Sequence, residues 1–353
     1  MASTSKSRKP SSYDVARLAG VSQTTVSFVL NQKRDARISE ETRQRVMQAA
    51  SSLGYVMNSR PRTAATGKTY RIGFVPIDPR FIGGEYYRII VDQVVQRASD
   101  LGYNLLIHTT HMSDVDELYR DILSGAADGV LLIGRYDGDL LTQKLLDARF
   151  PTVCVAYQPG RPEATSVDVD LVSCGRLMAR HLLNLGHRSI GVIAGRLNNS
   201  WTRGMLRGIR QEIQKESGIR AGLLEVESAA GSHTGAQQIL RAHLIRPDRP
   251  TGLIVTEDWR ATQVLSMLAE LGIKVPKDVA IVTTPATELT DNATPRLTAV
   301  YEPLGQLGSL ALETLVELIE GRVPPKRQVL PVRMVIRESC GGNPSHPPVL
   351  WDR

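Results

Sequence analysis

The stretch SSYDVARLAGVSQTTVSFVLN, residues 11–31, decides how the N-terminal part of this 353-residue chain folds. Ser11 and Asp14 have the spacing of a capping box, in which the hydroxyl accepts an early helical N–H and the carboxylate reaches back. We therefore expect a helix to begin there and to end at Gly20. Its apolar face, at helical spacing, would comprise Val15, Leu18 and Ala19.

A second helix is expected directly after this turn, capped by Ser22. The apolar spacing repeats at Val26, Val29 and Leu30. The opposite face carries Gln23, Thr24, Ser27, Phe28 and Asn31. Two short helices joined by a tight glycine turn are typical of a helix-turn-helix unit, whose second helix enters the major groove of DNA. The same pattern also fits an αα-hairpin without a DNA partner.

A third helix is predicted over residues 39–53. Ser39 can cap it, and Glu40 and Glu41 lie in its first turn, where the helix dipole favours anions. Its apolar residues are Val46, Ala49, Ala50 and Leu53. Three short helices of this kind can share one small core, which favours a helix-turn-helix domain.

Positive charge is concentrated at the same end of the chain. Residues 1–68 hold 12 of the 43 Lys and Arg residues against 4 of the 36 Asp and Glu residues, so of the formal charge of +7 this part carries +8 and the remainder −1. A basic head on a nearly neutral body is typical of a nucleic-acid-binding protein, because counterion release drives sequence-independent affinity. A basic solvated face is the alternative interpretation.

From residue 71 onward, short apolar runs alternate with amphipathic helical stretches. Strands are expected at 72–75, 104–108, 129–133, 152–156, 189–194, 252–255 and 280–284. Helices are expected at 85–101, 171–185, 202–216, 262–271 and 303–320. This alternation predicts doubly wound parallel α/β sheets, and a length of about 265 residues favours two lobes. Ligands of such folds bind outside the carboxyl ends of the strands, so we expect a site between the lobes.

Polar and aromatic side chains follow several of these predicted strands. They are Arg135, Tyr136, Asp137, Tyr157, Asn198, Trp201, Arg203, Glu257, Asp258 and Trp259. Carboxylates and arginines suit the hydroxyl groups of a carbohydrate, and an indole ring suits its apolar face. Ordinary roles in loops and helix caps are the alternative for these side chains.

Several segments resemble the LacI/GalR family of bacterial transcription regulators. Similar to the family's DNA-binding domain and hinge are YDVARLAGVSQTTVSFVLN (13–31), RISEETRQRVMQAASSLGYVMN (37–58), TAATGKT (63–69) and RIGFV (71–75). Similar to its effector-binding core are GHRSIGVIAG (186–195), ELGIKVPKDVAIV (270–282), TPRLTAV (294–300) and LPVRMVIRES (330–339). The resemblance implies an all-α headpiece, a hinge helix and a periplasmic-binding-protein-like (type I) core whose two lobes exchange strands.

The chain is accordingly divided into four expected parts. Residues 1–57 would form the helix-turn-helix domain and residues 58–69 the hinge. Residues 70–340 would form the effector-binding and dimerisation core, in which 294–300 would lie near the return of the chain to the first lobe. Residues 341–353 form a Pro-rich tail without heptads, so a tetramerising coiled coil is not expected.

The resemblance implies roles on DNA for individual residues. Gln23, Thr24 and Phe28 match the base-reading positions; Phe28 stands where Arg is frequent, so we expect it to contact a thymine methyl group rather than guanine. The positions that usually contact the DNA backbone are Tyr13, Ser22, Thr25, Ser27, Asn31 and Asn58. Two heads of a homodimer require a pseudo-palindromic operator in double-stranded DNA.

The hinge departs from the family pattern. Asn58 can cap a short helix, with Pro61 in its first turn and Gly67 at its end. In the family this segment orders when two subunits hold it in the minor groove, where an apolar side chain wedges between base steps. The usual Leu is Ala64 here, followed by Ala65, so a weaker kink is expected. A flexible linker is the alternative.

The effector site also departs from the family. Asp258 matches an Asp that commonly binds effector hydroxyls, whereas the preceding Asn has become Glu257. Met205 stands in place of an effector-binding Arg, with Arg203 two residues earlier, and Ala156 replaces a usual Asp. The family's G-[FY]-D-[DN] run is TTPA, residues 283–286. These changes predict a carbohydrate or related metabolite larger or less polar than a common monosaccharide, or else a degenerate site. The expected effector-binding residues are Asp258, Arg203, Trp201, Tyr136 and Trp259.

The sequence assembles no other chemistry. Cys154, Cys174 and Cys340 lack a repeated spacing, so we expect reduced thiols rather than disulfides or a zinc site. His108 and His111 have a spacing that could bind a metal, but no acidic or Cys partner recurs at ligand spacing. The sequence has neither a P-loop nor a nucleophile elbow, and no nucleophile and base can be paired. We therefore predict no catalytic residues, no metal and no cofactor.

The predicted function is that of a cytoplasmic, homodimeric transcriptional repressor whose operator affinity is modulated by a small molecule. The segment MASTSKSRKPSS has no apolar h-region, and no stretch approaches the ~20 apolar residues that span a bilayer, so no membrane partner is expected. The alternatives are a solute-binding or sensory protein, and an enzyme with a fused DNA-binding head.

Overall fold

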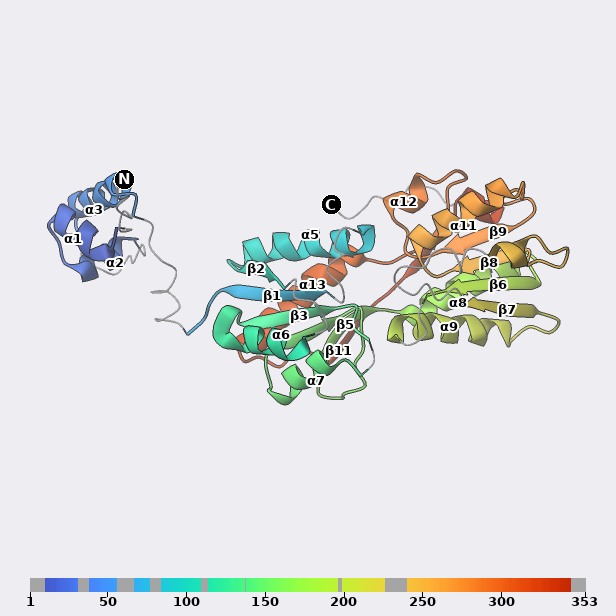
Figure 1. The fold of residues 1–353 in the computed structure, drawn as a ribbon, viewed down its shortest axis with the longest axis horizontal. Helices are drawn as coiled ribbons and strands as arrows, with labels where there is room; N and C mark the ends of the chain where they lie inside the picture. The colour runs from blue at the N-terminus through green and yellow to red at the C-terminus, as the bar shows by residue number, and fades with distance from the viewer. Residues whose placement is uncertain are drawn as a thin grey trace, which may run out of the picture. The chain divides into compact units, whose positions relative to one another are not determined.

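The computed structural model forms two compact units, Met1–Lys68 and Thr69–Arg353 (Figure 1). It describes residues 10–30, 38–55, 67–76, 84–108, 114–136, 138–195, 199–225 and 240–343. The described helices are all too short or too polar to cross a membrane. Each unit has its own hydrophobic core and is described separately.

Three helices form the first unit: α1 (Ser12–Ala19), α2 (Gln23–Leu30) and α3 (Glu40–Ser52). The predicted capping box is confirmed, since the Ser11 N–H donates to Asp14 Oδ2 at 2.9 Å and the Asp14 N–H donates to Ser11 Oγ at 3.4 Å. Gly20 ends α1 with a φ of 66°, in the left-handed region that glycine adopts at low cost. Ser22 caps the next helix by accepting the Thr25 N–H at 3.1 Å.

The three helices share one small core. It contains Val15, Ala16, Ala19, Val26, Val29, Val46, Ala49 and Ala50. The expected burial of Leu18 is wrong, because this side chain is 57% exposed and Ala16 is buried instead. At about 100° per residue, Leu18 lies roughly 110° from the centre of the face formed by Val15, Ala16 and Ala19.

Two six-stranded sheets, each the centre of one lobe, form the second unit. The first lobe has the strand order β11-β5-β4-β3-β1-β2, with parallel pairing throughout. Its strands are β1 (Arg71–Pro76), β2 (Asn104–Ile107), β3 (Gly129–Ile133), β4 (Thr152–Val155), β5 (Thr165–Val169) and β11 (Arg327–Leu330). In register, Ile72 of β1 lies opposite Gly129 of β3. The predicted doubly wound parallel sheet is confirmed in this lobe.

The second lobe has the strand order β12-β10-β9-β8-β6-β7, in which only β10 and β12 are antiparallel among the described strands. Its strands are β6 (Ser189–Ala194), β7 (Arg220–Glu225), β8 (Gly252–Val255), β9 (Ala280–Thr283), β10 (Thr298–Tyr301) and β12 (Arg333–Val335). The chain crosses between the lobes from β5 to the following helix, from β10 to the following helix and from β11 to β12. The lobes thus exchange strands, as the family resemblance implies.

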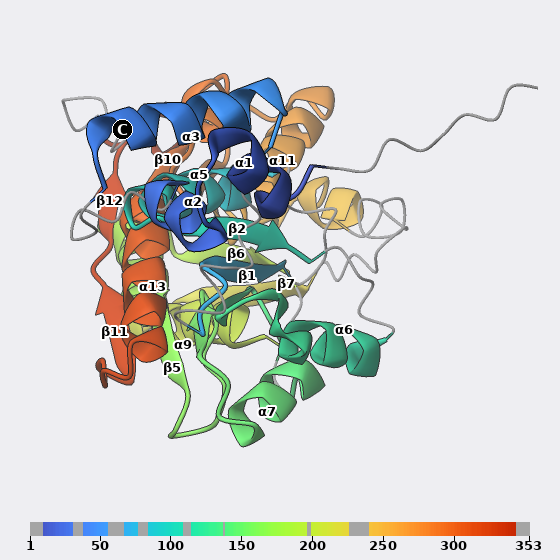
Figure 2. The same cartoon turned by 90° about the vertical axis from the view of Figure 1, so that its left-hand side faces the viewer.

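Helices cover both faces of the first sheet. On one face lie α5 (Glu85–Asp100) and α13 (Leu304–Ile319), packed on alternate strand residues such as Leu131 and Ile133. On the other face α6 (Val115–Asp121), η2 (Ile122–Ala126) and α7 (Leu140–Asp147) pack on Val130 and Leu132. Figure 2 shows α13 and α6 on opposite sides of the strands. The strands therefore read as continuous apolar runs, because both of their faces are buried.

The second sheet is covered in the same way. On one face lie α8 (Leu171–Asn184) and α9 (Ser200–Ile213), and on the other face lies α11 (Asp258–Glu270). The short helices α12 (Glu288–Asp291) and η3 (Glu338–Cys340) complete this lobe.

Two glycines allow α8 and α9 to approach closely. A Cβ atom on Gly175 would lie 2.0 Å from the backbone oxygen of Met205, and one on Gly208 would lie 2.0 Å from the backbone oxygen of Val172. Such distances exclude any side chain without a shift of the backbone. This packing fixes the start of α9, where Trp201 lies.

We expect Gly208→Ala to destabilise the second unit by about 1–3 kcal/mol, because the added methyl group overpacks a backbone contact. Urea unfolding followed by tryptophan fluorescence measures the change, since all three tryptophans, residues 201, 259 and 351, belong to the part of the sequence that forms the second unit. Gly160→Ala is the matched control, because nothing lies within 4 Å of the position that its methyl group would take and the residue is exposed. Equal losses in the two variants would contradict this packing argument.

Candidate functional sites

The first candidate site is the outer face of α2. Val26 and Val29 are buried in the three-helix core and so turn the opposite face of α2 outward. Gln23 and Thr24 are exposed at its first turn, where a recognition helix contacts base edges. Phe28, one turn further on, is half-buried. The helix therefore presents two exposed polar side chains and one half-buried aromatic side chain.

The residues expected at the DNA backbone are only partly described. Tyr13 is exposed on the first turn of α1, and Ser27 is half-buried. Ser22 is exposed, and its hydroxyl lies 2.9 Å from that of Thr25. Ser22, Thr25 and Ser27 thus place hydroxyl groups on α2 and at its start, and such groups can bind phosphates. Expected contacts that lie outside the described residues are Asn31, Asn58, Ala64 and Ala65.

The second candidate site lies at the carboxyl ends of the strands of the second unit. Asp258 begins α11 directly after β8 and is only 5% exposed. Its Oδ2 accepts the Thr287 hydroxyl at 2.7 Å, and its Oδ1 accepts the Trp259 N–H at 2.7 Å. Burial raises the pKa of Asp258, and these hydrogen bonds oppose the rise. Both oxygens thus already have partners within the chain.

The aromatic residue beside Asp258 has a cation on its ring. The Arg260 guanidinium lies 4.6 Å from the centre of the Trp259 ring, and its Nε donates to Glu257 Oε2 at 2.6 Å. The Trp259 side chain is 36% exposed, so part of the indole remains open to a ligand. The arginine that follows Trp259 was not recognised from the sequence as its partner.

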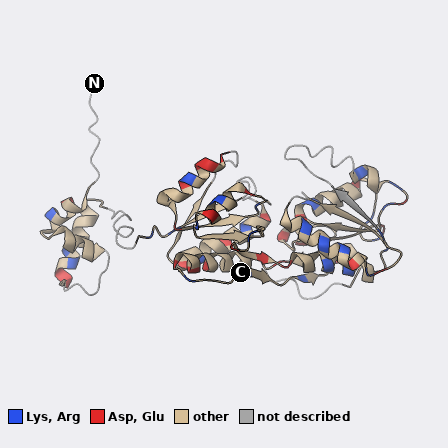
Figure 3. Ribbon diagram, turned by 90° about the horizontal axis from the view of Figure 1, so that it is seen from below, with Lys and Arg blue, Asp and Glu red and all other residues tan. Residues whose placement is uncertain are grey.

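The residues at the start of α9 have different environments. Trp201 is half-buried against the core of the second lobe, and its indole Nε1 has no hydrogen-bond partner among the described residues. Arg203 is exposed, on the same face of α9 as Arg207 and Arg210. Figure 3 shows Lys and Arg positions along the helices of this lobe. Trp201 therefore has a free buried donor, whereas Arg203 faces solvent.

The loop after β3 is held by a buried ion pair. Arg135, predicted to line the pocket, is 2% exposed, and its Nη2 donates to Asp139 Oδ1 at 2.6 Å. This pairing gives Arg135 a structural role, because the partner four residues on is equally buried. Tyr136 beside it is half-buried and Tyr157 is buried. Asp137 and Asn198 lie outside the described residues.

Two buried carboxyl groups at the crossovers were not recognised from the sequence. Glu302 follows β10 and is 2% exposed; its Oε1 accepts the Thr284 hydroxyl, and its Oε2 has no partner among the described residues. Burial raises the pKa of Glu302 to about 7, and the charges of Asp168 and Asp258 add to this. Burial also raises the pKa of Asp168, in β5, to about 7. A carboxylate directly after a buried strand was the signal for Glu302, but β10 was not among the predicted strands.

The remaining candidates form no further site in the described part of the chain. Cys154, Cys174 and Cys340 are buried free thiols, as expected. His108 pairs with Asp121 at 3.1 Å, and burial lowers its pKa. His111 lies outside the described residues. The described residues contain no group of three His, Cys, Asp or Glu side chains that could hold a metal.

Comparisons with known proteins agree with this division into a head and a core. The family described as "Bacterial regulatory proteins, lacI family" matches residues 13–58, and the "Periplasmic binding protein-like domain" matches residues 179–340. The transcriptional regulator CelR of Thermobifida fusca is 30% identical over 343 residues, which cover 94% of this chain and 98% of that protein. The regulator DegA of Bacillus subtilis is 29% identical, with 94% and 98% covered.

Two solved structures are similar over nearly the whole chain. One is a Lac repressor dimer bound to operator and the anti-inducer ONPF, with a TM-score of 0.81 and 25% identity over 94% of this chain and 99% of that chain. The other is a complex of the transcriptional regulator CelR with cellobiose, with a TM-score of 0.70 and 28% identity over 94% and 99%. Both chains therefore combine the same two kinds of unit.

The pKa of Glu302 predicts how stability changes with pH. Between its ordinary pKa of 4.5 and about 7, the unfolded chain loses this proton while the folded chain keeps it, so stability falls as pH rises through this window. Glu302→Gln lacks this loss. The difference in free energy of unfolding between the variant and the wild type is expected to rise by roughly 2–3 kcal/mol from pH 5 to pH 8. Urea unfolding at both pH values measures it.

Glu320→Gln, at the exposed end of α13, is the control for this titration. It should leave the difference between the two pH values unchanged. If Glu302→Gln differs from the wild type by the same amount at both pH values, the Glu302 carboxyl does not titrate in this window.

Proposed function

The chain belongs to the LacI family of bacterial regulatory proteins, and we propose that it acts as a DNA-binding transcriptional repressor whose two units have separate functions. The first unit reads an operator, and the second binds a small molecule that changes operator affinity. The observation that carries this proposal is α2, which is held by Val26 and Val29 with Gln23 and Thr24 exposed. A second helix of this kind is the part of a helix-turn-helix that enters the major groove.

On DNA, Gln23, Thr24 and Phe28 would read base edges. A glutamine amide can bond both hydrogen-bonding positions of adenine, and an aromatic ring edge can contact a thymine methyl group. Side chains with hydroxyl or amide groups would fix the register on phosphates. The residues proposed for that role are Tyr13, Ser22, Thr25, Ser27, Asn31 and Asn58, with Ala64 and Ala65 at the minor groove.

The protein is proposed to act as a homodimer on a pseudo-palindromic operator. The similar Lac repressor structure is a dimer on operator DNA, and a two-fold axis requires two half-sites. The expected parts of the chain, a head over 1–57, a hinge over 58–69 and a core over 70–340, suit this arrangement. We place its action in the cytoplasm, where the operator DNA lies, and assign it no catalytic activity because its similar relatives are transcription regulators.

The proposed effector is a carbohydrate of about disaccharide size. The CelR structure that resembles this chain holds cellobiose, and the indole rings of Trp201 and Trp259 with the carboxylate of Asp258 provide the stacking and hydrogen-bonding groups that a sugar needs. Met205 is fully buried and leaves the site without the family's arginine. The proposed contacts are Asp258, Arg203, Trp201, Tyr136 and Trp259.

Recovery of bound genomic DNA tests the proposed function directly. The purified full-length protein is incubated with sheared DNA from its source organism, and the retained fragments are sequenced. Enrichment of one pseudo-palindrome supports the repressor function. Retention without any enriched sequence, also in the presence of a metabolite extract, would contradict it.

Gln23→Ala is expected to lose discrimination at one base pair in each half-site, at a cost of about 1–3 kcal/mol. Binding to operators with single substitutions measures this loss. Gln48→Ala is the matched control, because Gln48 is an exposed glutamine on α3. Uniform weakening on every operator sequence would show that Gln23 does not read a base.

Asp258→Asn is expected to weaken release of the operator by sugars about 10- to 100-fold, because a hydrogen bond to a charged acceptor is worth about 1.5–3 kcal/mol. Titration of the protein–operator complex with a panel of mono- and disaccharides that includes cellobiose measures the effect. Glu270→Gln, at the exposed end of the same helix α11, should respond as the wild type does. Unchanged release by the Asp258 variant would remove Asp258 from the site.

A further inference from the structure

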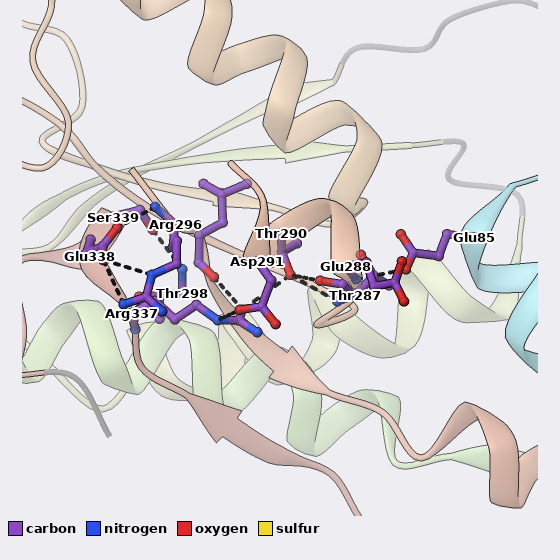
Figure 4. Close-up of polar contacts among 11 residues, drawn as sticks. Glu85, Thr287, Glu288, Thr290, Asp291, Arg296, Thr298, Arg337, Glu338 and Ser339 are labelled. Carbon is purple, nitrogen blue, oxygen red and sulfur yellow. Dashed lines mark hydrogen bonds and ion pairs between the residues drawn. The ribbon is translucent and has the colours of Figure 1, made fainter. Parts of the chain in front are cut away.

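Glu85 connects the two lobes of the second unit. It is the first residue of α5 in the first lobe, and its carboxylate accepts two N–H groups of α12 in the second lobe (Figure 4). The Glu288 N–H donates to Oε1 at 2.8 Å and the Leu289 N–H donates to Oε2 at 3.0 Å. The first N–H groups of a helix have no partner within it, so Glu85 supplies acceptors that α12 itself lacks. Hydrogen bonds to a carboxylate are stronger than those between neutral groups.

The residue before α12 connects the same helix to the proposed effector site. Thr287 donates its hydroxyl to Asp258 Oδ2 at 2.7 Å, and its N–H donates to Thr290 Oγ1 at 2.9 Å. Thr287 and Thr290 are both fully buried. Asp258 and Glu85 are therefore connected by the hydrogen bond to Thr287, by the backbone from Thr287 into the first turn of α12, and by the two hydrogen bonds to Glu85. The charge of Glu85 also contributes to the raised pKa of Asp258, after burial as the main cause, which agrees with their proximity.

The far end of α12 is anchored in its own lobe. Arg337, 5% exposed, has its Nε 2.8 Å from Asp291 Oδ1, and its Nη1 donates to Thr290 Oγ1 at 3.2 Å and to the Leu297 carbonyl oxygen at 2.7 Å (Figure 4). Breaking these contacts is costly, because it leaves the buried Arg337 guanidinium without its partners, although Asp291 itself is partly exposed. When the lobes separate, α12 must therefore stay with the second lobe, and the bonds to Glu85 must break.

We infer that Glu85 is a positioning residue for the effector site. Its two hydrogen bonds hold α12 against the first lobe and, through Thr287, oppose the binding of a ligand to Asp258. This inference rests on the proposed function in one respect, namely that Asp258 accepts a ligand hydroxyl. Asp258 is only 5% exposed, and each of its oxygens already accepts one hydrogen bond within the chain. A ligand hydroxyl that takes the buried position of the Thr287 hydroxyl on Oδ2 displaces it. The displaced threonine releases the turn before α12, which weakens the two bonds to Glu85. Ligand binding at Asp258 therefore weakens the hydrogen bonds between Glu85 and α12, and these hydrogen bonds in turn weaken ligand binding at Asp258.

Hydrogen exchange of the Glu288 and Leu289 amides tests the fastening without any ligand. The full-length protein is compared as wild type, Glu85→Ala and Thr287→Val, with exchange followed on peptides that contain residues 286–292. Protection of these two amides should fall about tenfold or more in both variants, since Glu85→Ala removes their acceptors and Thr287→Val removes the hydrogen bond that holds the residue before them. Asp100→Asn, at the opposite end of α5 and in an ion pair with Arg97, should leave it unchanged.

Protection of the α13 amides provides the folding check, because α13 packs on α5. If the α13 amides remain protected and those of residues 288 and 289 are also unchanged in Glu85→Ala, Glu85 does not fasten α12. If Glu85→Ala lowers protection but Thr287→Val does not, the connection to Asp258 is refuted.

Cellobiose binding, measured by calorimetry, tests the opposite sign of the linkage. Glu85→Ala is expected to bind cellobiose about tenfold more tightly than the wild type, whereas a variant that merely damaged the core would bind it more weakly. Weaker or equal binding by Glu85→Ala would overturn the competition. Absence of cellobiose binding in both proteins would count against the proposed disaccharide effector, while the exchange experiment alone would still decide the role of Glu85.

Discussion

The second unit depends on one constraint: its chain crosses between two parallel sheets at the ends of buried strands. A buried carboxyl group lies in or just before two of the three described crossovers. Asp168 lies just before the crossover from β5 to α8, and Glu302 lies in the one from β10 to α13. Because carboxyl ends of parallel strands converge, the same region also receives Asp258 and Trp201. The site is thus a consequence of the topology, and its charge is a consequence of which residues stand at the strand ends.

Local sequence patterns were sufficient to predict those helices and strands whose signals lie within the element itself. The capping box at Ser11 and the glycine at position 20 define α1 because both act within a few residues. Apolar runs identified β3, β6 and β8, which are buried on both faces. They did not identify β5, β11 or β12, since β5 contains Asp168, and β11 and β12 are short and bear arginines. Such strands are specified by their neighbours in the sheet rather than by their own sequence.

The candidate site was predictable in position but not in its partnerships. Following the strands in sequence located Asp258 and Trp259, because post-strand residues of an α/β fold meet at one edge. Their partners Thr287 and Arg260 could not be recognised in this way. Thr287 comes from another loop, and Arg260 lies on the Trp259 ring, where a ligand would otherwise stack. Arg135 illustrates the same difficulty, since its buried pairing with Asp139 gives it a structural role that its place after β3 does not reveal.

Several buried polar atoms without partners belong to residues at the ends of strands or the starts of helices. Among the described residues, the Tyr86 hydroxyl, Trp201 Nε1, Thr256 Oγ1 and Glu302 Oε2 are buried without a hydrogen bond. Each such atom lowers stability, because its hydration is lost and not replaced. All four stand near the start of a helix or just after a strand, and Glu302 lies in the crossover from β10 to α13. The proposed hydroxyl-rich ligand would offer both donors and acceptors to these atoms, and its hydrogen bonds would offset this cost. In the proposed function, ligand binding would thereby favour the arrangement of the lobes in which these atoms face the ligand. The second unit continues directly from the first at Thr69, so the proposed coupling to the head requires no separate linker partner.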